Sequence, residues 1–292
     1  MGSEGSAMGD LMKGKRGLVM GVANHNSIAW GIARTLAGHG AEIALTYQGE
    51  AFGKRVRPLA QEIGSDILIN CDVEDVATVD AVFDELERRW GRIDFVVHAV
   101  AFSDKNELKG LYADTTRENF TRTMVISCFS FTEVARRAAR ILNNGGALLT
   151  LTYDGSQRVM PNYNVMGVAK AALEASVRYL AADFGPRNIR VNAVSAGPVR
   201  TLAGAGVSDA RLMLNYQRRN APMRRNVTID EVGGASLYLL SDLANGVTGE
   251  IHYVDSGYNI MSMPALDELK EQERRAVLTG EVEASAEAPA VK

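Results

Sequence analysis

Short apolar runs alternate with longer helical patterns along most of the chain, from about residue 15 onward. The runs are four to six residues long and rich in Val, Ile and Leu, which is typical of buried strands. Because a helical segment separates each run from the next, the strands should lie parallel, with right-handed crossovers that place helices on both faces. The pattern therefore predicts an α/β fold: one doubly wound domain with a parallel sheet of about seven strands.

The expected elements follow from these runs. The strands are predicted at 17–20, 42–47, 67–71, 93–98, 147–152, 189–194 and 250–254. The helices are predicted at 28–38, 52–63, 76–90, a long region 117–142, 163–184, 209–219 and 229–241. We expect the domain to span 14–265, after a flexible extension at 1–13 and before a tail at 266–292 whose end is disordered. In such folds ligands bind at the C-terminal ends of the strands.

Composition excludes several classes of function. Hydrophobic content of 46% and charged content of 23% are ordinary for a folded globular protein. A net charge of −3 offers no positive field to a nucleic acid, and no apolar run is long enough to cross a membrane. Cys71 and Cys128 lie far apart, without metal-ligand spacing, and their number fits a reducing compartment. We expect a cytoplasmic protein without a metal, a membrane span or a nucleic-acid partner.

The turns after the first two strands carry weak signals for a dinucleotide. Gly21 would let the backbone approach a pyrophosphate, and Ser27 and Ile28 would open a helix whose N-terminal amides favour an anion. The usual G-x-G-x-x-G is absent. Gln48 stands where an acidic residue is common; it can bind hydroxyls, and no cation sits directly at that turn to meet a 2′-phosphate. These residues favour NADH over NADPH.

Later strand ends add to that signal. Asp72 could bind the edge of an adenine or could cap the helix that follows it. The run from His98 to Ala101 is small enough for a flat ring to lie against the backbone, and we expect His98 itself to be structural. The sixth strand leads into a loop rich in Gly and Ala, so we predict a substrate lid at about 196–220.

Tyr163 and Lys170 are seven residues apart in a predicted helix. At about 100° per residue the two side chains point the same way from one rigid element. A cation near a phenol favours the phenolate, which would suit proton donation or stabilisation of a developing oxyanion. The alternative is that both are surface residues of an ordinary amphipathic helix, and spacing alone does not decide between the two.

Taken together, these motifs resemble the divergent short-chain dehydrogenases/reductases, and within them the bacterial enoyl-acyl-carrier-protein reductases of type II fatty-acid synthesis. The resemblance covers roughly residues 13–265. The motifs that carry it are Gly21-x5-Ser27-Ile28-Ala-x-Gly31, Tyr47-Gln48, Cys71-Asp72-Val73, Tyr153-x9-Tyr163-x6-Lys170 and Ser195-Ala-Gly-Pro-x-Arg-Thr-Leu202. Ordinary members of the superfamily carry Tyr-x3-Lys with a serine before it; here Met166 holds that tyrosine position and Tyr153 that serine position.

The resemblance implies a single-domain Rossmann-type fold and NADH-dependent reduction of the trans-2 double bond of enoyl-acyl-carrier-protein thioesters in fatty-acid elongation. Hydride would pass to C3 and leave an enolate. Tyr163 would hydrogen-bond the thioester oxygen, and Lys170 would hold the nicotinamide ribose. Tyr153 would line the site and aid protonation or positioning of the substrate.

The resemblance also implies the wider site. The cofactor contacts would be Gly21, Ser27, Ile28, Gln48, Asp72, Val73, Val100, Lys170, Val199, Arg200, Thr201, Leu202 and Ala203. The acyl pocket would be lined by Phe102, Ser103, Tyr153, Tyr163, Met166, Val207 and Met213. Acidic acyl carrier protein would meet a basic rim of Arg211, Arg218, Arg219, Arg224 and Arg225, although each arginine could equally be a solvated helix face. The family resemblance implies a homotetramer.

Two residues depart from the family pattern. Ala101 stands where glycine is usual, which would tighten the nicotinamide site against flat aromatic inhibitors, and Ala210 replaces a larger aromatic residue, which would widen the acyl channel.

Two rival hypotheses remain. A 3-ketoacyl or other carbonyl reductase is one rival, and Met166 argues against it. The other is a regulatory protein that binds NADH without turnover of enoyl substrates.

Overall fold

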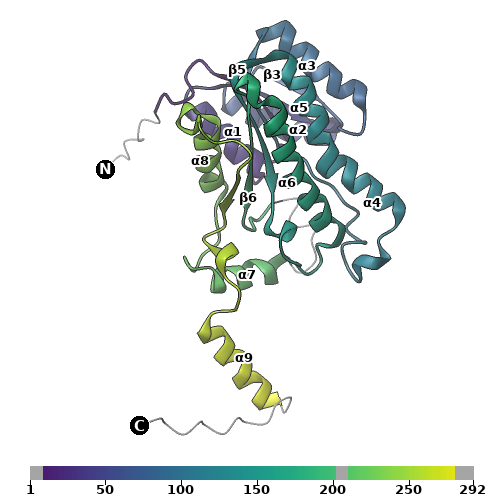
Figure 1. The fold of residues 1–292 in the computed structure, drawn as a ribbon, viewed down its shortest axis with the longest axis vertical. Helices are drawn as coiled ribbons and strands as arrows, with labels where there is room; N and C mark the ends of the chain where they lie inside the picture. The colour runs from purple at the N-terminus through teal and green to yellow at the C-terminus, as the bar shows by residue number, and fades with distance from the viewer. Residues whose placement is uncertain (1–8, 202–209, 280–292) are drawn as a thin grey trace.

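The computed structural model describes residues 9–201 and 210–279, which form one parallel sheet between two helical layers (Figure 1). The strand order is β3-β2-β1-β4-β5-β6-β7. All neighbouring strands pair in parallel, which confirms the predicted doubly wound sheet. The strands are β1 (Arg16–Met20), β2 (Glu42–Tyr47), β3 (Ile67–Asn70), β4 (Ile93–His98), β5 (Leu142–Thr152), β6 (Arg190–Ala196) and β7 (Ile251–Val254).

The helices follow the predicted order with shifts of a few residues at most ends. Within the described residues they are α1 (Ile28–Gly38), α2 (Gly49–Glu62), α3 (Val76–Trp90), α4 (Arg117–Met124), α5 (Ser130–Ile141), α6 (Asn164–Phe184), α7 (Ala210–Asn220), α8 (Ile229–Leu240) and α9 (Leu266–Thr279). None of these described helices is long and apolar enough to cross a membrane.

The core lies on both faces of the sheet because successive strand residues point to opposite sides. In β1, Leu18 and Met20 pack with α3, α5 and α6. Val19, between them, packs with α1, α2 and α8 on the other face. Figure 1 shows these two helical layers on either side of the strands. Strands buried on both faces explain why the runs in the sequence are continuously apolar.

The strand order reverses between β1 and β4, and this point positions the site. After β1 the chain moves outward to β2 and β3, then returns to add β4 on the other side. Met20 and His98 are register partners, so Gly21 and Ala99 leave the sheet side by side. Crevices outside such reversal points are the usual ligand sites of open α/β sheets.

Two predicted helices differ from the structure. The region 117–142 is not one α-helix: α4 leads into a π-helical turn, η2 (Val125–Phe129), and then into α5. Single π-turns inside helices are often found at functional sites, and Ile126 of this one lines the cavity described below. The helix predicted from Tyr163 begins one residue later, and Tyr163 is its N-cap, with φ −114° and ψ −26°.

The predicted terminal segments are described only in part. Within 1–13, Met12 is fully buried and its N–H donates to the carbonyl of His39, so packing begins before residue 14. Within 266–292, residues 266–279 form α9, which extends away from the sheet in Figure 1. Its first turn is bound to α7 by an ion pair between Arg219 and Glu268 at 3.2 Å.

Candidate active site

A cavity of about 660 Å³ lies at the C-terminal ends of β1, β2, β3 and β4. This volume is in the usual range for sites that bind small molecules or cofactors. Predicted cofactor residues gather in its wall from six separate segments of the chain. They are Gly21, Ser27, Ile28, Gln48, Asp72, Val73, Val100, Lys170 and Thr201.

Gly21 brings the turn after β1 close to the backbone of Ala99 in the wall of this cavity. Its φ is +96°, and a Cβ built there would lie 2.1 Å from the carbonyl oxygen of Ala99. Only glycine fits such a position, because both the conformation and the space exclude a side chain. Ser27 Oγ accepts hydrogen bonds from the N–H groups of Ala23 and Asn24, each at 3.1 Å, and so shapes the loop that leads into α1. The cradle is that expected for a pyrophosphate.

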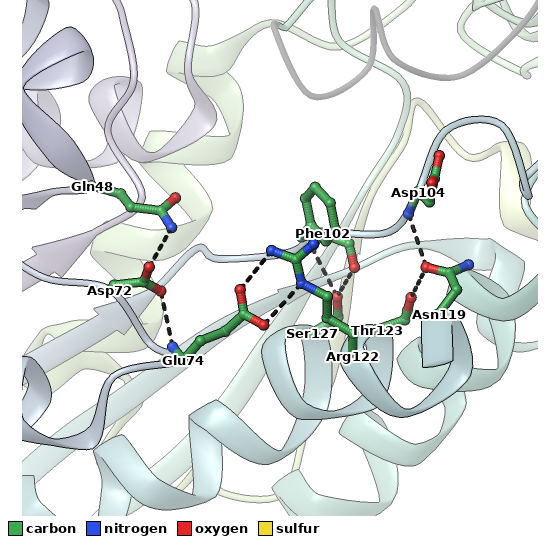
Figure 2. A network of polar contacts seen from close by, with 9 residues as sticks. All are labelled: Gln48, Asp72, Glu74, Phe102, Asp104, Asn119, Arg122, Thr123 and Ser127. Carbon is green, nitrogen blue, oxygen red and sulfur yellow. Dashed lines mark hydrogen bonds and ion pairs between the residues drawn. The ribbon is translucent and has the colours of Figure 1, made fainter. Parts of the chain in front are cut away.

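Gln48 and Asp72 meet at the end of β2. Gln48 Nε2 donates to Asp72 Oδ2 at 2.9 Å, and Asp72 Oδ1 accepts from the N–H of Glu74 at 2.9 Å (Figure 2). The helix cap is Asp75, which accepts from the N–H of Ala77, so the alternative reading of Asp72 as the cap is wrong. Asp72 is thus positioned at the cavity wall as an acceptor, and its charge disfavours a phosphate group there.

Arg122 is a wall residue that the sequence did not indicate. Its guanidinium binds Glu74 through two contacts of 2.9 and 2.8 Å and lies over the ring of Phe102, 4.5 Å from the centroid. Ser127, from the π-turn, accepts from the Phe102 N–H at 3.0 Å and donates to its carbonyl at 2.9 Å. Figure 2 shows these contacts as neighbouring groups, with the chain Gln48–Asp72–Glu74–Arg122 beside the Phe102–Ser127 pair. Arg122 lies on a helix of ordinary polar pattern, so only the tertiary fold reveals its role.

Lys170 enters the cavity from α6. Its side chain is 6% exposed, and Nζ donates to the carbonyl of Leu151, in β5, at 2.8 Å. Burial lowers the pKa of Lys170 to about 8, while the nearby Cys128 and Glu174 act in the opposite direction. A lysine with one backbone acceptor retains donors for a ligand hydroxyl. The surface-residue alternative for Lys170 is therefore wrong.

Tyr153 and Tyr163 contact each other at the start of α6. Burial raises the pKa of Tyr163, with smaller contributions from Tyr153 and Glu174, and burial likewise raises the pKa of Tyr153. The expected acidification of Tyr163 by Lys170 is therefore wrong for this structure, because the pKa of Tyr163 is raised and removal from water is the largest cause. Both phenols stay neutral at physiological pH and can donate hydrogen bonds.

Of the predicted acyl-pocket residues that the structure describes, Phe102 lines the cavity and the others do not. Phe102 is 40% exposed and lines the cavity. Met166 is buried, with its sulfur 3.7 Å from Ser127 Oγ, and Ser103 Oγ accepts from Thr123 Oγ1 at 2.9 Å. Within the described part of the cavity wall, Ser103, Tyr153, Tyr163, Met166 and Met213 do not appear.

The lid is only partly described. Leu202, Ala203 and Val207 lie outside the described residues, as does the Ala210 side chain. Thr201 lines the cavity; of the two predicted contacts before it, Val199 packs against the core and Arg200 is exposed.

The predicted basic rim is partly neutralised by carboxylates. Three of its arginines form ion pairs, which are Arg219–Glu268 at 3.2 Å, Arg224–Asp267 at 3.7 Å and Arg225–Glu231 at 2.6 Å. Arg211 and Arg218 are exposed on α7. Those two side chains are the better candidates for contact with an acidic partner.

Comparison with known proteins agrees with this geometry. A family model described as Enoyl-(Acyl carrier protein) reductase matches residues 21–259. The chain belongs to the enoyl-(acyl carrier protein) reductase family. It is 73% identical over 263 residues to the enoyl-[acyl-carrier-protein] reductase [NADH] 2 of Rhizobium meliloti, covering 90% of this chain and 98% of that protein. It is 65% identical to reductase 1 of the same organism over 88% of this chain and 94% of that protein.

A solved structure extends the likeness to three dimensions. The enoyl-acyl-carrier-protein reductase of Anaplasma phagocytophilum, crystallised with NAD, has a TM-score of 0.86 and 55% identity, and the match covers 90% of this chain and 98% of that one.

His98 of the present chain is structural, as predicted: it is buried between Ser130 Oγ at 2.8 Å and Thr150 Oγ1 at 3.2 Å. Among the described residues there is no cluster of His, Cys, Asp and Glu that could hold a metal.

Proposed function

We propose that this enzyme uses NADH to reduce the trans-2 double bond of enoyl thioesters carried by acyl carrier protein. The observation that carries the proposal is where the tyrosines stand relative to Lys170 in α6. Met166, where a carbonyl reductase would need its tyrosine, is buried against Ser127 and Leu108. The phenols stand instead at Tyr163 and Tyr153, whose rings are in contact. The acid is therefore displaced from the position used to reduce a carbonyl, as needed when charge collects on a more distant oxygen.

The described residues fit the cofactor. The Gly21 cradle and the start of α1 would hold the pyrophosphate, Gln48 and Asp72 the adenosine, and Lys170 the nicotinamide ribose. When bound, NADH supplies the hydride. Asp72 and Glu74 place carboxylates beside the adenosine end, and the nearby Arg122 is already bound to Glu74, which disfavours a 2′-phosphate.

The protein groups act on the developing enolate. A neutral Tyr163 would donate a hydrogen bond to the thioester oxygen, where negative charge accumulates. Lys170 adds positive potential in a water-poor site, where electrostatic interactions are stronger than in water. Tyr153, edge-on to Tyr163, would hold that ring and the substrate in place.

The experiment compares substrates, and each reaction is followed by the loss of NADH absorbance. Crotonyl or longer trans-2-enoyl thioesters are tested beside acetoacetyl thioester, with Tyr163→Phe and with Tyr179→Phe as matched control. Tyr179 lies in the same helix but is 77% exposed. We expect turnover of the enoyl substrate alone, reduced only in Tyr163→Phe. Turnover of the ketoacyl substrate would indicate a carbonyl reductase, and NADH binding without any turnover a regulatory protein.

We further propose a cytoplasmic homotetramer. Support for assembly comes from apolar side chains exposed on the outer helical layer, including Phe129 at 53% and Val168 at 37%. Support for the compartment comes from Cys71 and Cys128, which are both free thiols. Light scattering of the purified protein tests the first proposal, because a monomeric mass contradicts it. Fractionation of expressing cells tests the second.

A further inference from the structure

Glu174 carries a buried carboxylate next to the proposed catalytic residues. It lies one helical turn after Lys170 in α6 and is 1% exposed. A buried carboxylate is unfavourable unless several donors replace water. Here Oε1 accepts from Thr152 Oγ1 at 2.7 Å and from Ser156 Oγ, and Oε2 accepts from Gln157 Nε2 at 2.6 Å.

The three donors lie on both sides of Tyr153 in the sequence. Thr152 ends β5 directly before it, Ser156 ends the short turn η3 (Asp154–Ser156), and Gln157 is the C-cap of that turn. Glu174 therefore binds both arms of the turn that carries Tyr153. It fixes that turn to the helix that carries Lys170 and begins beside Tyr163.

Two glycines bring the same turn close to the start of α6. A Cβ built on Gly155 would lie 2.5 Å from the ring of Tyr163, and one built on Gly167 would lie 2.7 Å from the carbonyl oxygen of Gly155. The η3 turn is thus clamped at two places, by glycine contacts near Tyr163 and by the Glu174 carboxylate farther along α6. Between these two places the backbone of Tyr153 has little freedom.

We propose that Glu174 is a positioning residue for the tyrosine pair, setting Tyr153 against Tyr163 through its bonds to Thr152, Ser156 and Gln157. The proposal rests on the proposed function, in which both phenols face the enoyl thioester. In this role Glu174 acts through its bonds and not through the substrate, because its carboxylate accepts from Thr152, Ser156 and Gln157 around Tyr153. A displacement of about 1 Å at a reacting group can lower turnover a hundredfold, so loss of this clamp should be visible in kcat.

The test uses a reciprocal exchange of amide and carboxylate. In Glu174→Gln the new side chain still accepts through its oxygen, but its amide nitrogen faces Gln157, whose amide must turn over to offer its oxygen. The bonds also lose the charge of the carboxylate, and bonds to an ionised group are roughly twice as strong as neutral ones. Gln157→Glu in the same chain restores one donor and one acceptor. Asp183→Asn, an exposed carboxylate of the same helix, is the control. Gln157→Ala weakens the clamp from the loop side and leaves α6 intact, should Glu174→Gln fold poorly.

We expect Glu174→Gln to lower kcat for an enoyl thioester about 10- to 100-fold, with melting temperature and NADH affinity by fluorescence close to wild type. The ring signals of Tyr153 and Tyr163 in ¹³C-tyrosine-labelled protein, assigned through their Phe variants, should shift. Both effects should reverse in the double variant, and Gln157→Ala should show a smaller loss.

Two results would overturn the proposal. One is an unchanged kcat and unchanged tyrosine signals in Glu174→Gln. The other is a fall in kcat that the double variant does not restore and that comes with an equally marked fall in melting temperature and NADH affinity. That result would indicate a general structural role. If the wild-type enzyme turned over no enoyl substrate, the proposed function would be refuted. The tyrosine signals of the variants would still test whether Glu174 positions the tyrosine pair.

Discussion

The rings of Tyr153 and Tyr163 lie edge to face, with centroids 5.1 Å apart and planes at 74°. Edge-to-face pairs of this kind stabilise each other by about 0.5–1.5 kcal/mol beyond the area that they bury. The contact joins the end of β5 to the start of α6. Burial of this part of the site is the main reason why the pKa values of both phenols are raised.

The first prediction separates the two hydroxyl groups. Tyr163→Phe should lower kcat about 100- to 1,000-fold, since it removes a donor aimed at the developing oxyanion. Tyr153→Phe keeps the ring contact and should lower kcat less. The measurement is steady-state turnover of an enoyl thioester by all three proteins. Equal losses in both variants would mean that the roles of the tyrosines are not divided in this way.

The second prediction concerns pH and Lys170. Burial lowers its pKa in the native protein to about 8, so the ammonium is present below that pH and lost above it. We therefore expect kcat/KM to be level below pH 8 and to fall about tenfold per pH unit above it, because this parameter reports the free enzyme. Lys170→Met should be slow at every pH and lack this alkaline limb. A wild-type profile that is flat to pH 10 would contradict the assignment.

The third prediction concerns the Gly21 cradle. Gly21→Ala puts a methyl group against the Ala99 carbonyl in a left-handed conformation, so NADH affinity should fall more than tenfold and unfolding free energy by about 1–3 kcal/mol. Gly185→Ala is the matched control, because its φ is −53° and a Cβ there meets nothing within 4 Å. Fluorescence titration and urea unfolding are the measurements. An unaffected NADH affinity in Gly21→Ala would place the pyrophosphate elsewhere.

The fourth prediction concerns acid stability and His98. Burial lowers its pKa to about 3, against 6.5 for the ordinary side chain. Between these values the unfolded chain binds a proton that the native protein does not, so stability falls as pH falls. From pH 6.5 to 4.5 this residue should remove about 2–3 kcal/mol from the free energy of unfolding. In His98→Asn urea unfolding should show that much less acid sensitivity; identical pH slopes would refute the prediction.

The fifth prediction concerns the exposed arginines of α7. Arg211→Glu and Arg218→Glu should raise KM for enoyl-acyl carrier protein several-fold and reduce its dependence on salt, because these charges face an acidic partner. KM for the matching enoyl-coenzyme A thioester should change little. Arg88→Glu, on the exposed side of α3, serves as the control. Equal effects on both thioesters would argue against a carrier-protein contact at α7.

Much of the fold and the cofactor half of the site could be predicted from local pattern. Alternating runs indicate parallel strands, and parallel strands bring their C-terminal ends to one edge. Gly21, Gln48, Asp72 and Val100 were therefore expected near each other, although they are far apart in the sequence, and all four line one cavity. Helix boundaries near the site were less predictable, because the π-turn at Val125–Phe129 has no sequence signal of its own.

Both halves of the site depend on contacts between residues far apart in the sequence, which no local pattern records. Arg122 meets Glu74 across 48 positions, and Glu174 meets Thr152 across 22. In the sequence alone, nothing near Glu74 or Glu174 indicates the partner of either carboxylate. Their partners are decided by which helices pack together.

The sequence by itself determined the order of strands and helices, the glycine at the first turn and the Tyr-x6-Lys spacing, because these follow from backbone conformation and periodicity. Only the tertiary structure decided the protonation of the site. Tyr163 was expected to be made more acidic by Lys170, yet burial raises its pKa and lowers that of Lys170. Desolvation depends on every element packed around a group, so it arises only when the whole fold is assembled.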